Sequence, residues 1–369
     1  MMMTVWNTVE LRNLCSRLSR GKNIAAKDIS EIGPYPVYGG NGIRGYTDTY
    51  NFDGECAIIG RQGAKCGNVR YFKGRAYMTE HAVVTCANDE NNTRFLAYLL
   101  GTMQLGRLSG QSAQPGLSVK TLGIQEVNVP DLLTQRQISC LLGEFDDLIE
   151  HNKVVNKNLE EQLGTIYHQI FDKETEFTEL GSMINTTSGG TPSRKRDDFY
   201  ENADICWIKS KELSGGYIID TEEKINDLAI QKSSAKMLPS HSILIAMYGA
   251  TVGESAIIAK PMTCNQAICA LIPNESCPYP YLYQVAKEAK SELINMAVGS
   301  AQQNISQVLI KQLKIHSNVE SIKKFCFIAK PIHDRLESLC TESVVLADLR
   351  DTLLPRLMSG EIDVSKIEV

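Results

Sequence analysis

The chain has 369 residues, of which 43% are hydrophobic and 22% charged, and its formal net charge is −5. This length allows two or three domains with their own cores, and the composition excludes a disordered chain. No apolar run is long enough to cross a membrane, the first residues lack a signal peptide's apolar core, and the 11 cysteines include no CxxC pair for zinc. We therefore expect a cytoplasmic protein with free thiols, no metal site and no membrane contact.

The charge is unevenly distributed along the chain. Residues 1–130 carry 14 basic and 10 acidic side chains, whereas residues 131–178 carry 4 and 10. The corresponding numbers are 13 and 14 for residues 179–316, and 7 and 9 for residues 317–369. Because affinity for phosphates depends on local positive surface, a basic first segment leaves nucleic-acid binding open despite the negative total.

The globular segments combine short apolar runs with glycine-rich turns. Cys56–Ile59 and Ser242–Met247 are typical of buried strands, and Gly39-Gly40 and Asn41-Gly42 supply turns that tolerate positive φ. We expect strands mixed with helices in both halves. The predicted divisions are a globular segment over residues 1–131, a long helix over 132–175, a second globular segment over 176–317, and a second long helix with a tail over 318–369.

Two segments, 134–171 and 320–358, carry apolar residues three and four positions apart. This spacing predicts two helices about 50–55 Å long that pack as an antiparallel coiled coil, with polar seam positions that fix the register. Pro355 is expected to kink or end the second helix. The first predicted seam is Leu141, Phe145, Leu148, Val155, Leu159, Ile166 and Ile170, with polar Asn152 and Gln162. The second is Ile328, Ile332, Leu339, Leu346, Leu349, Leu353 and Leu357, with polar Arg335 and Glu342.

The second half of the chain repeats landmarks of the first. Gly110–Leu122 reappears as Gly299–Ile310 at a shift of 188 residues, and Ala57–Gly67 reappears as Leu244–Gly253 at a shift of 186. The apolar pattern of the two helices is offset by 187 residues. A repeat of this length predicts two structurally related halves and not a solenoid, whose period would be several-fold shorter.

Three further motifs accompany the repeated Ser-Ala-Gln segments. They are GPYPVYGGNGIRGYTD at Gly33–Asp48, SGGTPSRKRDDFYENADICWIKSKEL at Ser188–Leu213, and LLPRLMSGEIDV at Leu353–Val364. Because these motifs occur together and in this order, the chain resembles the specificity subunit of Type I restriction–modification systems over essentially its whole length. The resemblance implies an α/β (α+β) two-repeat fold, with two target recognition domains of mixed strands and helices joined by the two long helices.

The resemblance also implies a protein without catalysis of its own. Each recognition domain would read one half of a split double-stranded DNA target, and the helices would dock two modification (methyltransferase) subunits, which restriction subunits join. S-adenosylmethionine, ATP and Mg²⁺ would be bound by those partners, which methylate adenine and cleave DNA. The helix residues implied in partner binding are Phe145, Leu148, Val155, Leu159, Ile166, Ile332, Leu339, Leu346 and Leu353.

The residues themselves agree that catalytic motifs are missing. The sequence has no Asn/Asp-Pro-Pro-Tyr/Phe segment and no GxxxxGK[ST] phosphate loop. In Gly60–Gly67 we interpret the glycines as a tight strand connection, because Gly63 and Gly67 recur as Gly249 and Gly253 whereas Lys65 does not. His81 and His241 have no metal-ligand spacing and are interpreted as ordinary core or surface histidines.

DNA reading requires long donor and acceptor side chains and cations for phosphates, set on a rigid scaffold. Several such residues follow predicted strands, although solvated surface charge is the competing interpretation for each one. The candidates in the first half are Arg44, Arg61, Gln62, Lys65, Arg70, Lys73 and Arg75. Those in the second are Arg194, Lys195, Arg196, Lys209, Lys211, Tyr248, Asn265 and Gln266. We favour a structural role for Gln114 and Gln302, since they recur in halves that should read different bases.

Three functions remain open at this point. The first is a specificity subunit that directs adenine methylation and cleavage, or methylation alone. The second is a stand-alone nuclease, which the missing catalytic cluster disfavours. The third is a coiled-coil scaffold that no longer reads DNA, which the basic first segment disfavours. Because the two halves diverge outside their shared landmarks, we expect an asymmetric, bipartite DNA target.

Overall fold

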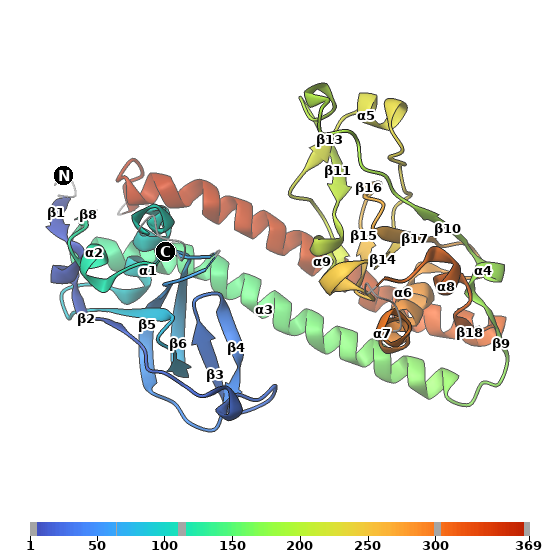
Figure 1. The fold of residues 1–369 in the computed structure, drawn as a ribbon, viewed down its shortest axis with the longest axis horizontal. Helices are drawn as coiled ribbons and strands as arrows, with labels where there is room; N and C mark the ends of the chain where they lie inside the picture. The colour runs from blue at the N-terminus through green and yellow to red at the C-terminus, as the bar shows by residue number, and fades with distance from the viewer. Residues whose placement is uncertain (1–5, 64, 110–115, 299–303, 365–369) are drawn as a thin grey trace. The chain divides into compact units, whose positions relative to one another are not determined.

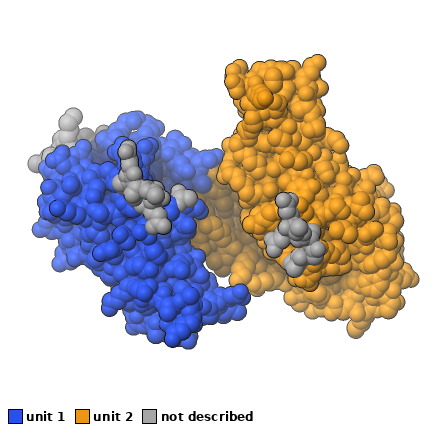
Figure 2. All heavy atoms as spheres, viewed as in Figure 1, with its two compact units in different colours: residues 1–147, 347–369 blue, residues 148–346 orange. Residues whose placement is uncertain are grey.

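The computed structural model describes all residues except 1–5, 64, 110–115, 299–303 and 365–369. The chain divides into two compact units, residues 1–147 with 347–369 and residues 148–346 (Figure 1; Figure 2). Each unit contains one globular segment and a part of both long helices. No described helix is long and apolar enough to span a membrane.

Unit 1 is built on a six-stranded sheet in the order β2-β7-β5-β6-β3-β4. Neighbouring strands are antiparallel except β3 and β6, which are parallel. Helix α1 packs on β5 and β6, and its Leu96 and Leu100 share a buried cluster with Ile59. The elements are β1 Asn7–Glu10, β2 Cys15–Arg20, β3 Tyr35–Gly39, β4 Gly42–Thr47, β5 Phe52–Gly60, β6 Val69–Met78, β7 Ala82–Ala87, α1 Thr93–Thr102, α2 Val119–Gly123 and β8 Glu126–Val129.

Unit 2 has a five-stranded sheet in the order β10-β17-β14-β15-β12 and a smaller sheet in the order β13-β11-β16. Helix α6 packs on β14 and β15, which places Tyr281 in a buried cluster with Ile243 and Ile257. The strands are β9 Phe177–Glu179, β10 Asn185–Ser188, β11 Ile205–Ile208, β12 Tyr217–Ile218, β13 Lys224–Ile225, β14 Ile243–Ala246, β15 Ser255–Ile258, β16 Thr263–Cys264, β17 Ile268–Ile272 and β18 Lys314–His316. The short helices are α4 Leu180–Met183, α5 Asp227–Lys232, α6 Tyr279–Glu288, α7 Lys290–Val298 and α8 Gln307–Lys311.

The two units share one framework. The strand order β2-β7-β5-β6 of unit 1 corresponds to β10-β17-β14-β15 of unit 2, and the next strand in each sheet, β3 or β12, runs parallel to its neighbour. The repeat and the mixed fold class predicted from the sequence are therefore confirmed. The units differ beyond this framework, because unit 1 adds the β3–β4 hairpin and unit 2 adds the β13-β11-β16 sheet with α5 (Figure 1).

Two 40-residue helices, α3 Leu132–Phe171 and α9 Val319–Met358, confirm the predicted long helices. Both contribute to each of the two units. Helix α9 continues past Pro355 to Met358, so this proline does not end the helix, contrary to one of the two predicted outcomes.

The contacts between α3 and α9 have the antiparallel order that was predicted. Within unit 1, Asp146 accepts a hydrogen bond from Arg350 at 2.6 Å. Within unit 2, Asn152 lies later on α3 and donates from Nδ2 to Glu342, which lies earlier on α9, at 3.0 Å. Asn152 is buried, so this predicted polar seam position faces the other helix, where it contacts the predicted polar position Glu342, whose side chain is exposed.

The rest of the predicted seam is partly wrong. Leu148, Ile328 and Leu349 are exposed, and so are the predicted polar positions Gln162 and Arg335. The helices pack on the globular core as well as on each other, so the buried face is not a simple two-helix seam. Among the apolar residues, burial is greatest at Ile138, Leu142, Leu163, Tyr167 and Phe171 on α3 and at Ile322, Phe325, Ala329, Leu336, Leu339 and Leu357 on α9.

His333 of α9 is completely buried in unit 2. Its Nδ1 lies 3.0 Å from the Tyr217 hydroxyl, and the rings of Tyr279 and Tyr283 lie 5.4 and 5.9 Å from the imidazole. Its Nε2 has no hydrogen-bond partner among the described residues. Burial lowers the pKa of His333 to about 3, because the aromatic surroundings do not replace the water that an imidazolium would lose.

We expect His333 to make the stability of unit 2 depend on pH. Because its pKa is lower in the folded than in the unfolded chain, protons bind preferentially to the unfolded chain between about pH 6.5 and about pH 3. The free energy of unfolding should therefore fall as pH falls through this window, by about 1.4 kcal/mol per pH unit from this group. Urea unfolding of the wild type and His333→Gln across the window measures this contribution.

The His333→Gln variant should have the shallower pH dependence. Tyr217→Phe is the matched control, because it removes the hydrogen bond but leaves the imidazole in place. An equal pH dependence in the wild type and His333→Gln would contradict the expectation.

Candidate nucleic-acid interface

The same turn connects β5 to β6 in unit 1 and β14 to β15 in unit 2. In each, the last glycine donates its N–H back to the end of the preceding strand, at 2.7 Å in unit 1 and 3.0 Å in unit 2. All four recurring glycines have positive φ, which favours glycine. Their φ values are 82° for Gly63, 84° for Gly67, 76° for Gly249 and 80° for Gly253. The prediction that these glycines form tight strand connections is confirmed.

A second backbone contact ties each turn to the segment that leads into the next short helix. Leu117 donates its N–H to the Arg61 carbonyl at 2.9 Å, and Ile305 donates to the Met247 carbonyl at 2.9 Å. Leu117 and Ile305 are both buried, which shields these hydrogen bonds from water. The recurring glutamines, Gln114 and Gln302, lie outside the described residues.

In unit 1, the β3–β4 turn lies directly against the β5–β6 turn. A Cβ on Gly60 would be 2.3 Å from the carbonyl oxygen of Gly40, so the two backbones fit only without a side chain there. Beside them, Gln62 Oε1 is 2.9 Å from Nδ1 of His81, whose Nε2 is 3.0 Å from Glu80. The Gln62 side chain is therefore held at this surface by His81.

Two arginines lie over the glycines of the β3–β4 turn. A Cβ on Gly39 would be 2.6 Å from Cδ of Arg44, and a Cβ on Gly42 would be 2.7 Å from Nη1 of Arg70. The glycines therefore leave room for these side chains beside the β5–β6 turn, which carries exposed Lys65. This clustering of predicted residues depends on the hairpin, which is specific to unit 1.

The predicted cations of unit 1 fall into two sets. Lys73 pairs with Glu55 at 2.8 Å, and Arg75 pairs with Asp53 at 2.8 Å, so a carboxylate largely neutralises the charge of each of these two cations. The others have no ion pair with any residue that the structure describes. They are Arg44, Arg61, Lys65 and Arg70. Among the predicted cations of unit 1, those of the turn region are therefore best able to attract an anionic ligand.

In unit 2, the predicted polar residues gather around the β14–β15 turn. Met247 donates its N–H to the Ala267 carbonyl at 2.8 Å, which places exposed Tyr248 beside the turn before β17. In that turn, Asn265 accepts from the Ala267 N–H at 3.1 Å, and Gln266 contacts the hydroxyl of Thr191. Asn265 thus serves its own turn, whereas Tyr248 and Gln266 reach the surface.

Most predicted cations of unit 2 are already paired with carboxylates. Arg196 donates to both oxygens of Asp198, at 2.8 and 2.6 Å, and Lys211 lies 2.5 Å from Glu222. Arg194 and Lys209 share the carboxylate of Glu223. Of the five predicted cations, Lys195 is the one without an ion pair within the described part of the chain. The carboxylate partners were not identified from the sequence.

The helix residues implied in partner binding are mostly used within their own unit. Leu339 is buried, Leu159, Ile166 and Ile332 pack against the main cluster of unit 2, and Leu353 packs against that of unit 1. The remaining four are half-buried or exposed, and they are Phe145, Leu148, Val155 and Leu346. Phe327 of α9, which was not predicted, is 84% exposed.

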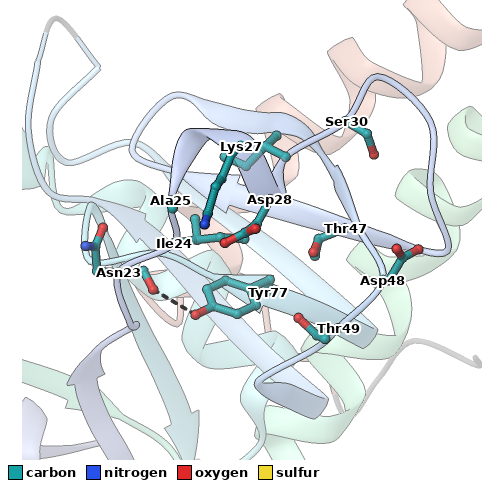
Figure 3. A pocket seen from close by; sticks show the side chains of 11 residues that line it. Asn23, Ile24, Ala25, Lys27, Asp28, Ser30, Thr47, Asp48, Thr49 and Tyr77 are labelled. Atoms are coloured by element: carbon teal, nitrogen blue, oxygen red, sulfur yellow. Dashed lines mark hydrogen bonds between the residues drawn. The ribbon is translucent and has the colours of Figure 1, made fainter.

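Unit 1 also contains an open cavity of about 510 Å³ that none of the predicted residues lines (Figure 3). Three separate segments form its wall, and Tyr77 donates its hydroxyl to the Asn23 carbonyl at 2.8 Å. No sequence pattern predicts this cavity, because only the fold brings the segments together. The lining residues are Asn23, Ile24, Ala25, Lys27, Asp28, Ile29, Ser30, Thr47, Asp48, Thr49 and Tyr77. No cluster of three or more His, Cys, Asp or Glu side chains suited to a metal occurs among the described residues.

The chain is similar to known proteins in sequence and in fold. The family model for the Type I restriction modification DNA specificity domain matches residues 3–161 and 172–317. The Type I restriction enzyme EcoprrI specificity subunit of Escherichia coli is 42% identical over 136 residues, 36% of this chain and 34% of that protein. The MjaIX specificity subunit of Methanocaldococcus jannaschii is 25% identical over 305 residues, 74% of this chain and 70% of that protein.

The chain thus spans about a third of the length of the first relative and about two thirds of the second. A crystal structure of a Type I restriction–modification S subunit from M. genitalium has the same fold, with a TM-score of 0.62. That match covers 96% of both chains at 18% sequence identity.

The shared turn makes a stability prediction. Gly63→Ala should cost about 1–2 kcal/mol, because its φ is positive but nothing lies within 4 Å of the added Cβ. Gly67→Ala should cost about 2–5 kcal/mol, because its Cβ would also lie 2.1 Å from the backbone nitrogen of Gly106. Urea unfolding of both variants checks the order, and equal costs would show that the Gly67 contact is not tight.

Proposed function

This chain belongs to the Type I restriction–modification DNA specificity family, and from that premise we propose that it is the specificity subunit of such a system. Its two globular segments would each bind one part of a split DNA target. The observation that carries the proposal is one backbone framework present twice, with the same turn and different surface side chains. A framework that is fixed while its side chains vary suits a protein whose partners differ in sequence and not in shape.

The difference between the two units supports an asymmetric target. Unit 1 presents Arg44 and Arg70 over its hairpin, whereas unit 2 presents Tyr248 and Gln266 beside a turn without that hairpin. Arginine can donate to guanine O6 and N7, and glutamine can pair with adenine N6 and N7. We infer that the two halves of the target differ in sequence, since two copies of one surface would read a palindrome.

The helices would hold the two readers at a set spacing and dock other subunits. We propose two modification subunits as the partners of α3 and α9, with restriction subunits joining that core. S-adenosylmethionine, ATP and Mg²⁺ would be bound by those partners, so this chain would contribute positioning and no chemical step. A methylation-only system would use the same chain without restriction subunits.

Co-expression with the modification subunit in a methylation-free host tests the proposal. Sequencing of genomic N6-methyladenine should reveal one split motif that is lost when the surface residues of either unit are changed. Absence of any motif, despite a stable complex with the modification subunit, would instead support the scaffold alternative.

The unpaired cations of unit 1 should contribute more to DNA affinity than the paired ones. Replacing both Arg44 and Arg70 by Ala should weaken binding about tenfold or more, and should reduce the slope of log K against log salt by about 1.8 if each contacts a phosphate. Replacing Lys73 and Arg75 by Ala removes the same formal charge but should change the slope less, since Glu55 and Asp53 already neutralise them. Fluorescence anisotropy of a labelled duplex over a salt series distinguishes the pairs, and equal losses would contradict the assignment.

A further inference from the structure

Arg194 of unit 2 is held from several sides. Its guanidinium lies over the rings of Tyr200, at 4.7 Å, and Trp207, at 5.1 Å. Its Nη2 donates to one carboxylate oxygen of Glu223. The other oxygen of Glu223 accepts from Lys209. Two aromatic faces and one carboxylate thus fix the plane and the direction of the guanidinium.

The groups that hold Arg194 are themselves anchored. Trp207 is buried, and its indole N–H donates to the Gly190 carbonyl at 3.0 Å, while the Tyr200 hydroxyl donates to the Pro192 carbonyl at 2.8 Å. The Glu223 carbonyl accepts from the backbone N–H of Trp207 at 3.1 Å. The support is therefore built from neighbouring strands and not from a mobile side chain.

Glu223 remains ionised in this arrangement. Hydrogen bonds from Lys209 and Arg194 hold its pKa below the usual range of a carboxyl group. With Arg194 and Lys209 the group carries a net positive charge, and exposed Lys195 adds to it. The cluster therefore attracts an anion even though it contains a carboxylate.

Arg194 retains donors for a further acceptor. A guanidinium has five N–H donors, and the contact with Glu223 uses Nη2 alone. The Arg194 side chain is 54% exposed, compared with 19% for Lys209. Because Arg194 lies flat on its own domain, it reaches no farther than the domain surface. That reach suits a DNA phosphate on the outside of the duplex better than a base edge within a groove.

We propose that Arg194 binds a DNA phosphate and that Glu223 is its positioning residue. The proposal rests on the proposed DNA-reading function and deepens it, since it assigns a contact that orients unit 2 without selecting a base. The contact Thr191–Gln266 joins the segment before Arg194 to the turn beside Tyr248, so this phosphate site borders the predicted reading surface.

The test uses the complex of the full chain with its modification subunit, and duplexes with and without the methylated motif. Arg194→Ala should weaken binding to both duplexes by a similar factor, about tenfold, and reduce the salt slope by about 0.9. Arg194→Lys keeps the charge but loses the planar fork, so it should weaken binding with little change in the slope. The methylated motif should be unchanged in both variants.

Glu223→Gln gives the sharper result, because the two explanations predict opposite signs. If Glu223 positions Arg194, this variant should bind DNA about three- to tenfold more weakly although it removes a negative charge. Its matched control is Glu222→Gln, which removes the neighbouring carboxylate that pairs with Lys211 and should bind DNA equally or more tightly. Unchanged thermal unfolding of each variant shows that the fold is retained.

Several results would overturn the assignment. A gain of affinity in Glu223→Gln equal to that in Glu222→Gln would show that Glu223 only repels DNA. A change of the methylated base in an Arg194 variant would show that Arg194 reads a base. If Arg194→Ala binds DNA as tightly as the wild type, the proposed phosphate contact is wrong but the proposed function stands. If the wild-type complex neither binds nor methylates DNA, the proposed function is wrong as well.

Discussion

The surface of both units depends on one backbone hydrogen bond that fixes a glycine turn to the segment behind it. The carbonyls of Arg61 and Met247 accept at 2.9 Å from buried Leu117 and Ile305. In each unit a serine follows directly and caps a short helix. The turn is thus tied to the chain that leads into the long helix. Its side chains can change while its backbone stays in place, because none of these bonds uses a side chain of the turn.

The sequence predicted the elements whose signals are local. Positive φ requires glycine at Gly63 and Gly67, and an identical pair 186 residues later identified the same turn in the other half. The spacing of apolar residues likewise predicted both long helices. The seam of those helices was less predictable, since Tyr167 and Phe171 on α3 pack against Tyr281 of α6, and a helix pattern does not show which neighbour it contacts.

The charge state of the candidate site could not be predicted from composition because pairing is a property of register. Asp53 lies opposite Arg75, and Glu55 lies opposite Lys73, in the antiparallel pairing of β5 and β6. Opposite charges at facing positions of a strand pair attract each other, so a correct register would have marked both cations as paired. No comparable rule was available for Glu223, which is 29 residues from Arg194 and immediately precedes β13.

The difference between paired and unpaired cations separates affinity from orientation. An unpaired cation at a phosphate releases counterions and strengthens binding to any DNA sequence, whereas a cation already held by a carboxylate gains less from the same phosphate. The advantage of a cation held by a carboxylate is geometric, because its side chain has already lost the conformational freedom that binding would otherwise remove. Four of the predicted cations of unit 1, namely Arg44, Arg61, Lys65 and Arg70, are of the first kind among the described residues, and Arg194 of unit 2 is of the second. Cations of the second kind can orient a recognition domain on the duplex, whereas the choice of sequence must come from base contacts, since attraction to phosphates does not distinguish one base sequence from another.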